Sequence, residues 1–175
     1  MKLRTFGFAA AVIALTALKA AAQSTTIQSD VLKDWTNMKD TMTKIADAMP
    51  EDKYGFKPTP AQRSYGEQLL HVAGANVGII KTLGGKAPAP TIDQKATSKA
   101  AIMKALADSY DYGIAVIKEQ TDQSMGEAVQ GPKVLGTATR ARLVWDTIGH
   151  AWDEYGAMTV YLRLNGVVPP ASRGM

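Results

Sequence analysis

The chain has 175 residues, of which 46% are hydrophobic and 21% charged. This composition is typical of one globular domain and excludes a disordered or collagen-like chain. The absence of cysteine excludes disulfides, thiolate nucleophiles, zinc fingers and iron–sulfur clusters. The formal charge of +4 depends on the start of the chain, because 17 basic and 16 acidic residues remain without Lys2, Arg4 and Lys19. Such a nearly neutral chain lacks the concentrated basic face that nucleic-acid binding requires.

Residues 1–22 have the three parts of a secretory signal peptide. A positive start (Lys2, Arg4) precedes an apolar run of about 13 residues and three alanines that end at Ala22. The apolar run is too short for a helix to cross ~30 Å of hydrocarbon. We therefore expect cleavage after Ala22, a mature domain of residues 23–175, and export to the periplasm or the extracellular space without a stable membrane span. An uncleaved anchor is the alternative.

Helical periodicity dominates the rest of the chain. It predicts helices at about residues 29–48, 64–83 and 98–120, and a fourth that starts near Thr137 or Thr139 and ends at about residue 165. Ser64 followed by Glu67 predicts a capping box at the second helix, and Asn165-Gly166 is typical of a helix end. The first helix carries an apolar stripe formed by Val31, Leu32, Trp35, Met38, Met42, Ile45, Ala46 and Met49.

Three connections separate these helices, and they contain no convincing strand. The first is polar and contains two prolines, residues 86–97 form an extended linker, and residues 121–136 indicate a loop. Four amphipathic helices of this length predict an all-α fold, a single four-helix bundle. Connections of about 14 to 17 residues allow non-sequential helices to be neighbours as well as an up-down order.

The last helix carries the best candidate for a metal site. On a helical wheel, His150 and Glu154 lie one turn apart and point the same way, at the edge of the apolar sector. An imidazole and a carboxylate at this spacing can share one cation. The same pair is also common as a simple ion pair. Asp146 and Tyr155 are near enough in sequence to assist, but nothing more specific supports them, and the catalytic residues remain unknown.

A third protein ligand would have to be His71, since the chain has only two histidines. On the second helix, Leu69, Ala73, Val77 and Ile80 define the main apolar face. His71 points nearly opposite, beside small residues that leave room for another helix, a ligand or solvent. Its distance from His150 and Glu154 is therefore decisive: polar atoms within about 3–5 Å of one another would make a shared cation credible.

Three segments, YGFKPTPAQRSYGEQLLH ending at His71, HAWDEYG beginning at His150, and YLRLNGVVPPAS near the C-terminus, resemble the DinB-like (DinB/YfiT-like) family of metalloenzymes. The resemblance covers the chain from about residue 29 to its end. It implies a four-helix bundle with a divalent metal, commonly zinc or nickel, on three histidines. The first two fall on His71 and His150, whereas the third falls on Glu154.

The glutamate leaves two hypotheses. In the first, His71, His150 and Glu154 bind a divalent cation, zinc or nickel with iron or manganese as alternatives, in an exported metal-dependent enzyme. The family's thiol transferase reactions suit an exported protein poorly, so a hydrolase acting on an unidentified small molecule is favoured over a transferase. In the second, the metal site is degenerate and the bundle binds a small ligand or a partner without catalysis.

Two tryptophans of the last helix suggest a homodimer. Trp145 and Trp152 lie off the apolar sector, so we expect both to be exposed.

Overall fold

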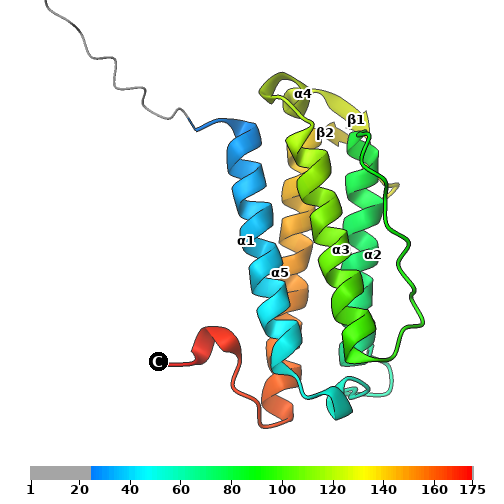
Figure 1. Ribbon diagram of the computed structural model, residues 1–175, viewed down its shortest axis with the longest axis vertical. Helices are drawn as coiled ribbons and strands as arrows, with labels where there is room; N and C mark the ends of the chain where they lie inside the picture. The colour runs from blue at the N-terminus through cyan, green and yellow to red at the C-terminus, as the bar shows by residue number, and fades with distance from the viewer. Residues whose placement is uncertain (1–24, 175) are drawn as a thin grey trace, which may run out of the picture.

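The computed structural model describes residues 25–174, so the expected signal peptide lies outside the described part of the chain. Within that part, four long helices lie side by side in a bundle (Figure 1): α1 (Ile27–Ala48), α2 (Tyr65–Ile80), α3 (Lys99–Lys118) and α5 (Arg140–Leu164). The predicted all-α four-helix bundle is confirmed. None of the described helices is long and apolar enough to cross a membrane.

α1 and α2 lie diagonally across the bundle, and so do α3 and α5, whereas α2 and α3 are direct neighbours. α1 packs against α3 and α5, and α2 packs against the same two helices. In Figure 1, α1 and α5 run downwards whereas α2 and α3 run upwards. α2 and α5 are therefore antiparallel neighbours, although residues 81–139 separate them in sequence. This is the non-sequential arrangement that the connection lengths allowed.

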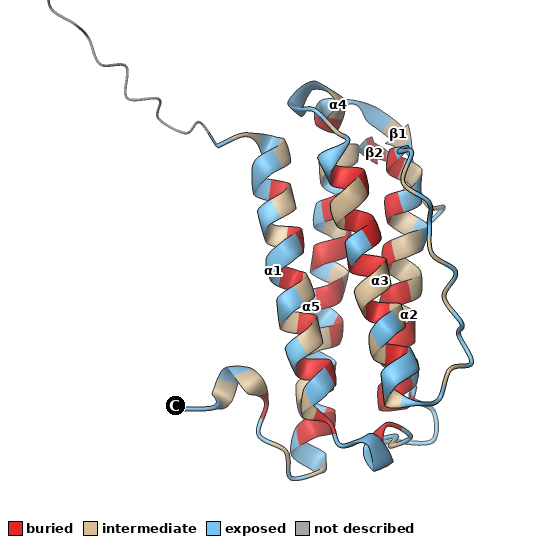
Figure 2. Cartoon of the chain, viewed as in Figure 1, coloured by how far each residue is buried: buried red, intermediate tan, exposed pale blue. Residues whose placement is uncertain are grey.

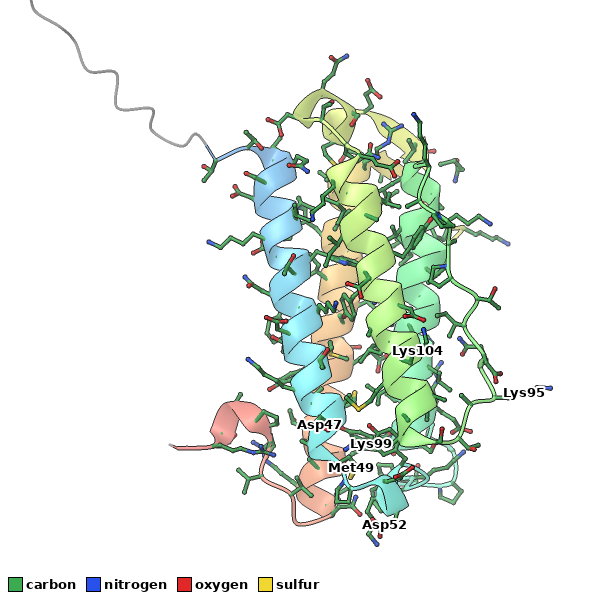
Figure 3. All side chains as sticks on the ribbon, in the orientation of Figure 1. Asp47, Met49, Asp52, Lys95, Lys99 and Lys104 are labelled. Atoms are coloured by element: carbon green, nitrogen blue, oxygen red, sulfur yellow. The ribbon has the colours of Figure 1, made fainter. Side chains whose placement is uncertain are left out.

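A long crossover makes this topology feasible. Residues 84–98 return outside the bundle from the end of α2 to the start of α3, as Figure 1 shows. The 16 residues of α2 rise about 24 Å, a span that an extended segment of this length covers easily. At its far end, the Lys99 ammonium group donates to the carbonyl oxygens of Asp47 and Met49 at 2.7 and 3.0 Å. Lys99 thus joins the start of α3 to the end of α1 (Figure 3).

The helix starts are capped largely as the sequence predicts. The Ser64 hydroxyl accepts from the Glu67 backbone N–H, and the Glu67 carboxylate accepts from the Ser64 N–H at 2.6 Å. Ser98 and Thr139 accept in the same way at α3 and α5. These contacts satisfy N–H groups that have no partner inside a helix.

The buried residues face the axis of the bundle (Figure 2). Trp35 of α1 is fully buried, and its indole N–H donates to the Tyr110 carbonyl of α3 at 2.9 Å. Gly113 lies beneath this ring: a Cβ added there would lie 2.3 Å from two of its carbon atoms. The close contact between α1 and α3 therefore depends on glycine at this position.

Two sequence-based expectations need correction. The predicted loop 121–136 contains a short helix, α4 (Asp122–Gly126), and the strand β1 (Ala128–Gln130), which pairs with β2 (Thr137–Thr139) in an antiparallel hairpin. Such short strands carry too few residues for a periodic signal. Val77, placed on the main apolar face of α2, is only half-buried. α2 contacts both α3 and α5, so its buried surface is wider than one stripe.

Candidate metal centre

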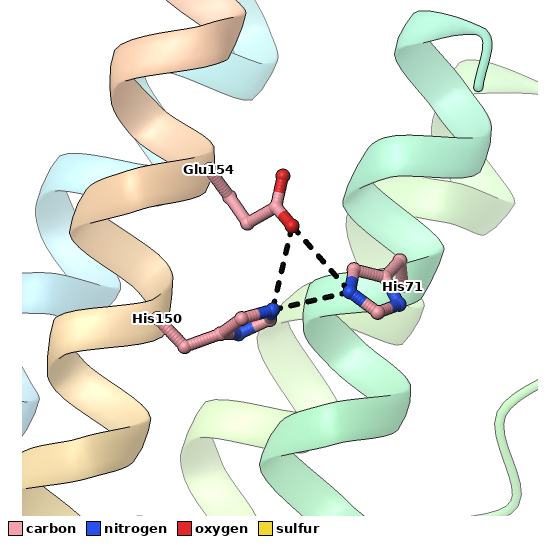
Figure 4. Close-up of side chains that lie close together, drawn as sticks. All are labelled: His71, His150 and Glu154. Carbon is pink, nitrogen blue, oxygen red and sulfur yellow. Dashed lines mark hydrogen bonds and ion pairs between the residues drawn. The ribbon is translucent and has the colours of Figure 1, made fainter. Parts of the chain in front are cut away.

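The three predicted ligands come together between α2 and α5. His71 projects from the middle of α2, and His150 and Glu154 project from successive turns of α5 (Figure 4). Because the two helices are antiparallel neighbours, residues far apart in sequence meet at mid-height. The spacing of four residues places His150 and Glu154 on one face of α5, as the helical wheel indicated.

The distances between the three polar atoms are short and nearly equal. The Nε2 atoms of His71 and His150 lie 3.1 Å apart, and each lies 3.4 Å from Oε1 of Glu154. Two ligands at about 2.0–2.1 Å from a tetrahedral zinc ion would lie ~3.3 Å apart. The observed triangle therefore has the size that a shared divalent cation requires.

Hydrogen bonding alone explains this triangle poorly. A neutral imidazole has one ring proton on its two nitrogens, and an ionised carboxylate only accepts. At most two ring protons, one from each neutral imidazole, can therefore lie between the three atoms, which leaves at least one of the three contacts without a hydrogen bond. A cation bound by all three atoms would satisfy each of them at once.

The electrostatics favour the protonation states that bind metal. Burial raises the pKa of the Glu154 carboxyl, but the hydrogen bond with His150 and the charges of both imidazoles and Arg63 lower it overall. Burial, followed by the positive charge of Arg63, lowers the pKa of His71 against the opposing effect of Glu154. An ionised carboxylate beside a neutral imidazole is the form that coordinates a cation.

Burial differs between the members of the site. The Glu154 side chain is only 9% exposed, whereas those of His71 and His150 are 34% and 28% exposed. A carboxylate this buried needs a counter-charge or several hydrogen bonds. The polar contacts of the Glu154 carboxylate among the described residues are the two imidazoles. The exposed fractions show that the site is open to solvent beside the histidines and closed behind Glu154.

One feature fits a metal less well. Nδ1 of His150 is buried and has no hydrogen-bond partner among the described residues. Metal-binding histidines usually donate this second N–H to a carboxylate or a carbonyl, which fixes the ring. The three ligand atoms therefore fit a cation, but the expected outer support of His150 is missing.

The two assisting residues considered from sequence do not join the site. Asp146 forms an ion pair with Arg142 at 3.3 Å, one turn away on α5. Tyr155 packs edge-on against Trp152 and lines a separate cavity beside α1. Proximity in sequence was the only argument for either residue, and helix geometry turns both away.

Sequence reasoning missed two residues at the mouth of the site. Arg63, one residue before the cap of α2, lines the same cavity as His71. Gln68, one turn before His71, is buried and lines a second cavity together with Arg63. Both residues lie within residues 54–71, a segment that carries the family resemblance, but nothing in that segment marks either of them as a site residue. Only the close approach of the 54–63 connector to α5 reveals them.

The tryptophans of α5 are where the helical wheel placed them. Trp145 is 46% exposed and Trp152 is 53% exposed. Their exposure is as predicted, and the homodimer that it suggested stays a prediction.

Comparison with known proteins identifies the family. The chain matches the DinB family model over residues 22–174. No curated protein matches it. Two solved structures are similar. A DinB-like protein from Bacillus cereus ATCC 10987 has a TM-score of 0.73 and 20% identity, covering 83% of this chain and 96% of that chain. A DinB-like protein from Bacillus subtilis has a TM-score of 0.61 and 13% identity, covering 78% and 92%. The match over nearly the whole sequence, on the same helical bundle, shows that the chain belongs to the DinB family.

Proposed function

We propose that His71, His150 and Glu154 bind one divalent cation and that the protein is a metal-dependent enzyme, most simply a hydrolase. The observation that supports this proposal is the convergence of three metal-binding atoms within 3.1–3.4 Å from two separate helices. Two imidazoles and one carboxylate form a ligand set found in catalytic zinc and iron sites. Compared with three histidines, the glutamate adds one negative charge and favours harder cations, so zinc, iron and manganese all suit the site, with nickel as a further candidate.

Glu154 and the two histidines would have different roles in binding the cation. Glu154 supplies the negative charge that retains the cation, and its burial keeps competing water away from that side. The two half-exposed imidazoles leave the opposite side open to the cavity in front of His71. A divalent cation in such a site lowers the pKa of bound water towards ~7, which makes hydroxide available at neutral pH.

The proposed location is outside the cytoplasm. The positive start, apolar run and alanines of residues 1–22 support export. Exported proteins meet an oxidising compartment, where low-molecular-weight thiols are poor cosubstrates. Hydrolysis needs only water as the second reactant, which is why we favour it over thiol transfer.

Elemental analysis of the untagged protein tests the metal proposal directly. We expect stoichiometric zinc, iron, manganese or nickel after purification, or stoichiometric uptake of added zinc after dialysis. His150→Ala should remove this metal because it leaves only two ligands on different helices. Substoichiometric metal that His150→Ala leaves unchanged would refute the proposal.

A second function is favoured by the unpartnered Nδ1 of His150. In this alternative the metal site is degenerate, and the bundle binds a small ligand or a partner without catalysis. Glu154→His distinguishes the two functions. A large gain in zinc affinity from near zero would indicate a lost site, whereas a small change would favour a working site with glutamate.

A further inference from the structure

Two cavities flank the mouth of the metal centre, and both are bounded by the end of the 54–63 connector. Each has a volume of about 500 Å³. The first is lined by Arg63, His71 and Gln94 of the crossover. The second is lined by Arg63, Gln68 and Ala157, which lies one turn after Glu154 on α5. Arg63 therefore borders both cavities beside the proposed metal ligands.

Arg63 is held in place through its backbone and not through its charge. The Tyr161 hydroxyl of α5 donates to the Arg63 carbonyl oxygen at 2.9 Å. The Tyr161 ring also packs edge-on against Phe56 of the connector, with ring centroids 6.2 Å apart. Within residues 25–174 the guanidinium group forms no ion pair and no hydrogen bond. The chain thus anchors the backbone of an exposed arginine whose guanidinium donors are free to bind a ligand.

Gln68 provides a second free donor beside Arg63. It is only 7% exposed, yet its side-chain amide has no hydrogen-bond partner in the described part of the chain. The amide is not among the polar atoms that are sealed off from solvent without a partner. Because Gln68 lines the second cavity, a ligand there can accept from its amide in place of water.

The other charges around the first cavity are already neutralised. Lys57 forms an ion pair with Glu67 at 3.0 Å, and Glu67 is also engaged in the capping box of α2. With a divalent cation on one carboxylate, the centre would retain a net positive charge, to which Arg63 adds. The free donors and the charge both select an acceptor that is negatively charged.

We propose that Arg63 and Gln68 bind an oxyanion of the substrate, a carboxylate or a phosphate group, next to the metal centre. The guanidinium fork matches either group with two parallel hydrogen bonds, and the Gln68 amide donates a further one. This inference deepens the proposed function and rests on it: the protein would act on small anionic molecules whose charged end is held beside the cation.

Fluorine NMR titration tests the proposal without an activity assay. The probes are 4-fluorobenzoate and 4-fluorophenyl phosphate, with neutral 4-fluorobenzamide for comparison, added to the zinc-loaded and the metal-free protein. Arg63→Gln removes the charge, and Gln68→Leu removes the amide. Arg163→Gln is the matched control, because Arg163 is an exposed arginine of α5 that lines neither cavity. Circular dichroism and zinc content establish that each variant is folded and loaded.

We expect at least one oxyanion to bind more tightly than the benzamide, and the tighter of the two identifies the charged group. Arg63→Gln should weaken that binding by roughly 10-fold or more, as for loss of a charge-assisted hydrogen bond. Gln68→Leu should weaken it less, and Arg163→Gln by less than about 2-fold.

The proposal is overturned if neither oxyanion binds at millimolar concentration, if the benzamide binds as tightly, or if Arg63→Gln binds like the wild type. Failure of the metal site gives a different result: zinc does not bind, while oxyanion binding that depends on Arg63 persists in the metal-free protein. Zinc binding with no dependence of oxyanion binding on Arg63 refutes the oxyanion site alone.

Discussion

Replacing Gly113 with alanine tests the packing of α1 against α3. The new Cβ would lie 2.3 Å from two carbon atoms of the Trp35 ring and 2.5 Å from its nitrogen. Trp35 cannot easily move aside, because it is fully buried, hydrogen-bonded to the Tyr110 carbonyl oxygen and packed on the Tyr110 ring at 5.1 Å. The two helices must separate instead, at a cost of about 1–3 kcal/mol.

Helix propensity acts in the opposite direction and has to be separated from this cost. Alanine is better than glycine inside a helix by about 0.5–1 kcal/mol. Gly78→Ala is the matched control: Gly78 is an exposed residue of α2, and a Cβ there meets no atom within 4 Å. Since both variants gain the same propensity, the difference between them measures the packing cost at Gly113.

Urea unfolding followed by far-UV circular dichroism gives the two free energies of unfolding. Gly78→Ala should be slightly more stable than the wild type, and Gly113→Ala about 1–3 kcal/mol less stable than Gly78→Ala. In thermal melts this difference corresponds to roughly 2–12 °C for a domain of this size. If Gly113→Ala is as stable as Gly78→Ala, the inference that Trp35 packs too closely on α3 to leave room for a Cβ at residue 113 is refuted.

Three further predictions concern the site and its surroundings. Zinc at about 100 times its Kd should raise the free energy of unfolding by ~2.7 kcal/mol. Differential scanning fluorimetry should show this as a rise in Tm of roughly 5–10 °C, and an equal rise in His150→Ala would contradict the assigned ligands. Tyr161→Phe should cost about 0.5–1.5 kcal/mol in urea unfolding, because the Arg63 carbonyl oxygen loses its donor, and unchanged stability would show that the connector is held by other contacts. The hydrogen bond from the Ser64 backbone N–H lowers the pKa of Glu67. The stability supplied by the Glu67 charge is therefore present above pH 4.5 and is lost as the pH falls through the lowered pKa. Over this pH range the Tm advantage of the wild type over Glu67→Gln should shrink, and a constant difference would exclude a role for the charge.

The architecture was predictable because its signals are local. Apolar residues at helical spacing, a capping box at Ser64 and helix stops at glycine and proline placed all four long helices. The buried sector of α5 follows from the same periodicity, including Glu154 inside it and Trp152 outside it. The hairpin of β1 and β2 was missed, because strands of three residues are too short to show a period of two.

The candidate site was only partly predictable. The pairing of His150 with Glu154 follows from their spacing on one helix, but the approach of His71 depends on which helices are neighbours. The wheel of α2 placed His71 opposite the main apolar face, and no local signal distinguishes solvent from a second helix there. The resemblance to the DinB family supplied the missing contact. Arg63 and Gln68 lie in a segment that carries the resemblance, but no local pattern marked them as site residues, because their place beside the site depends on tertiary structure.

The diagonal placement of α1 and α2 has a consequence for how the chain folds. α1 and α2 make their main contacts with α3 and α5, so the first half of the protein has no helical hairpin of its own to form. Its apolar stripes stay without partners until the second half arrives, which makes folding depend on contacts between distant segments and therefore slow for a helical protein. Cutting the chain within residues 84–98 would leave two fragments that are each unable to build a core, yet complementary when mixed.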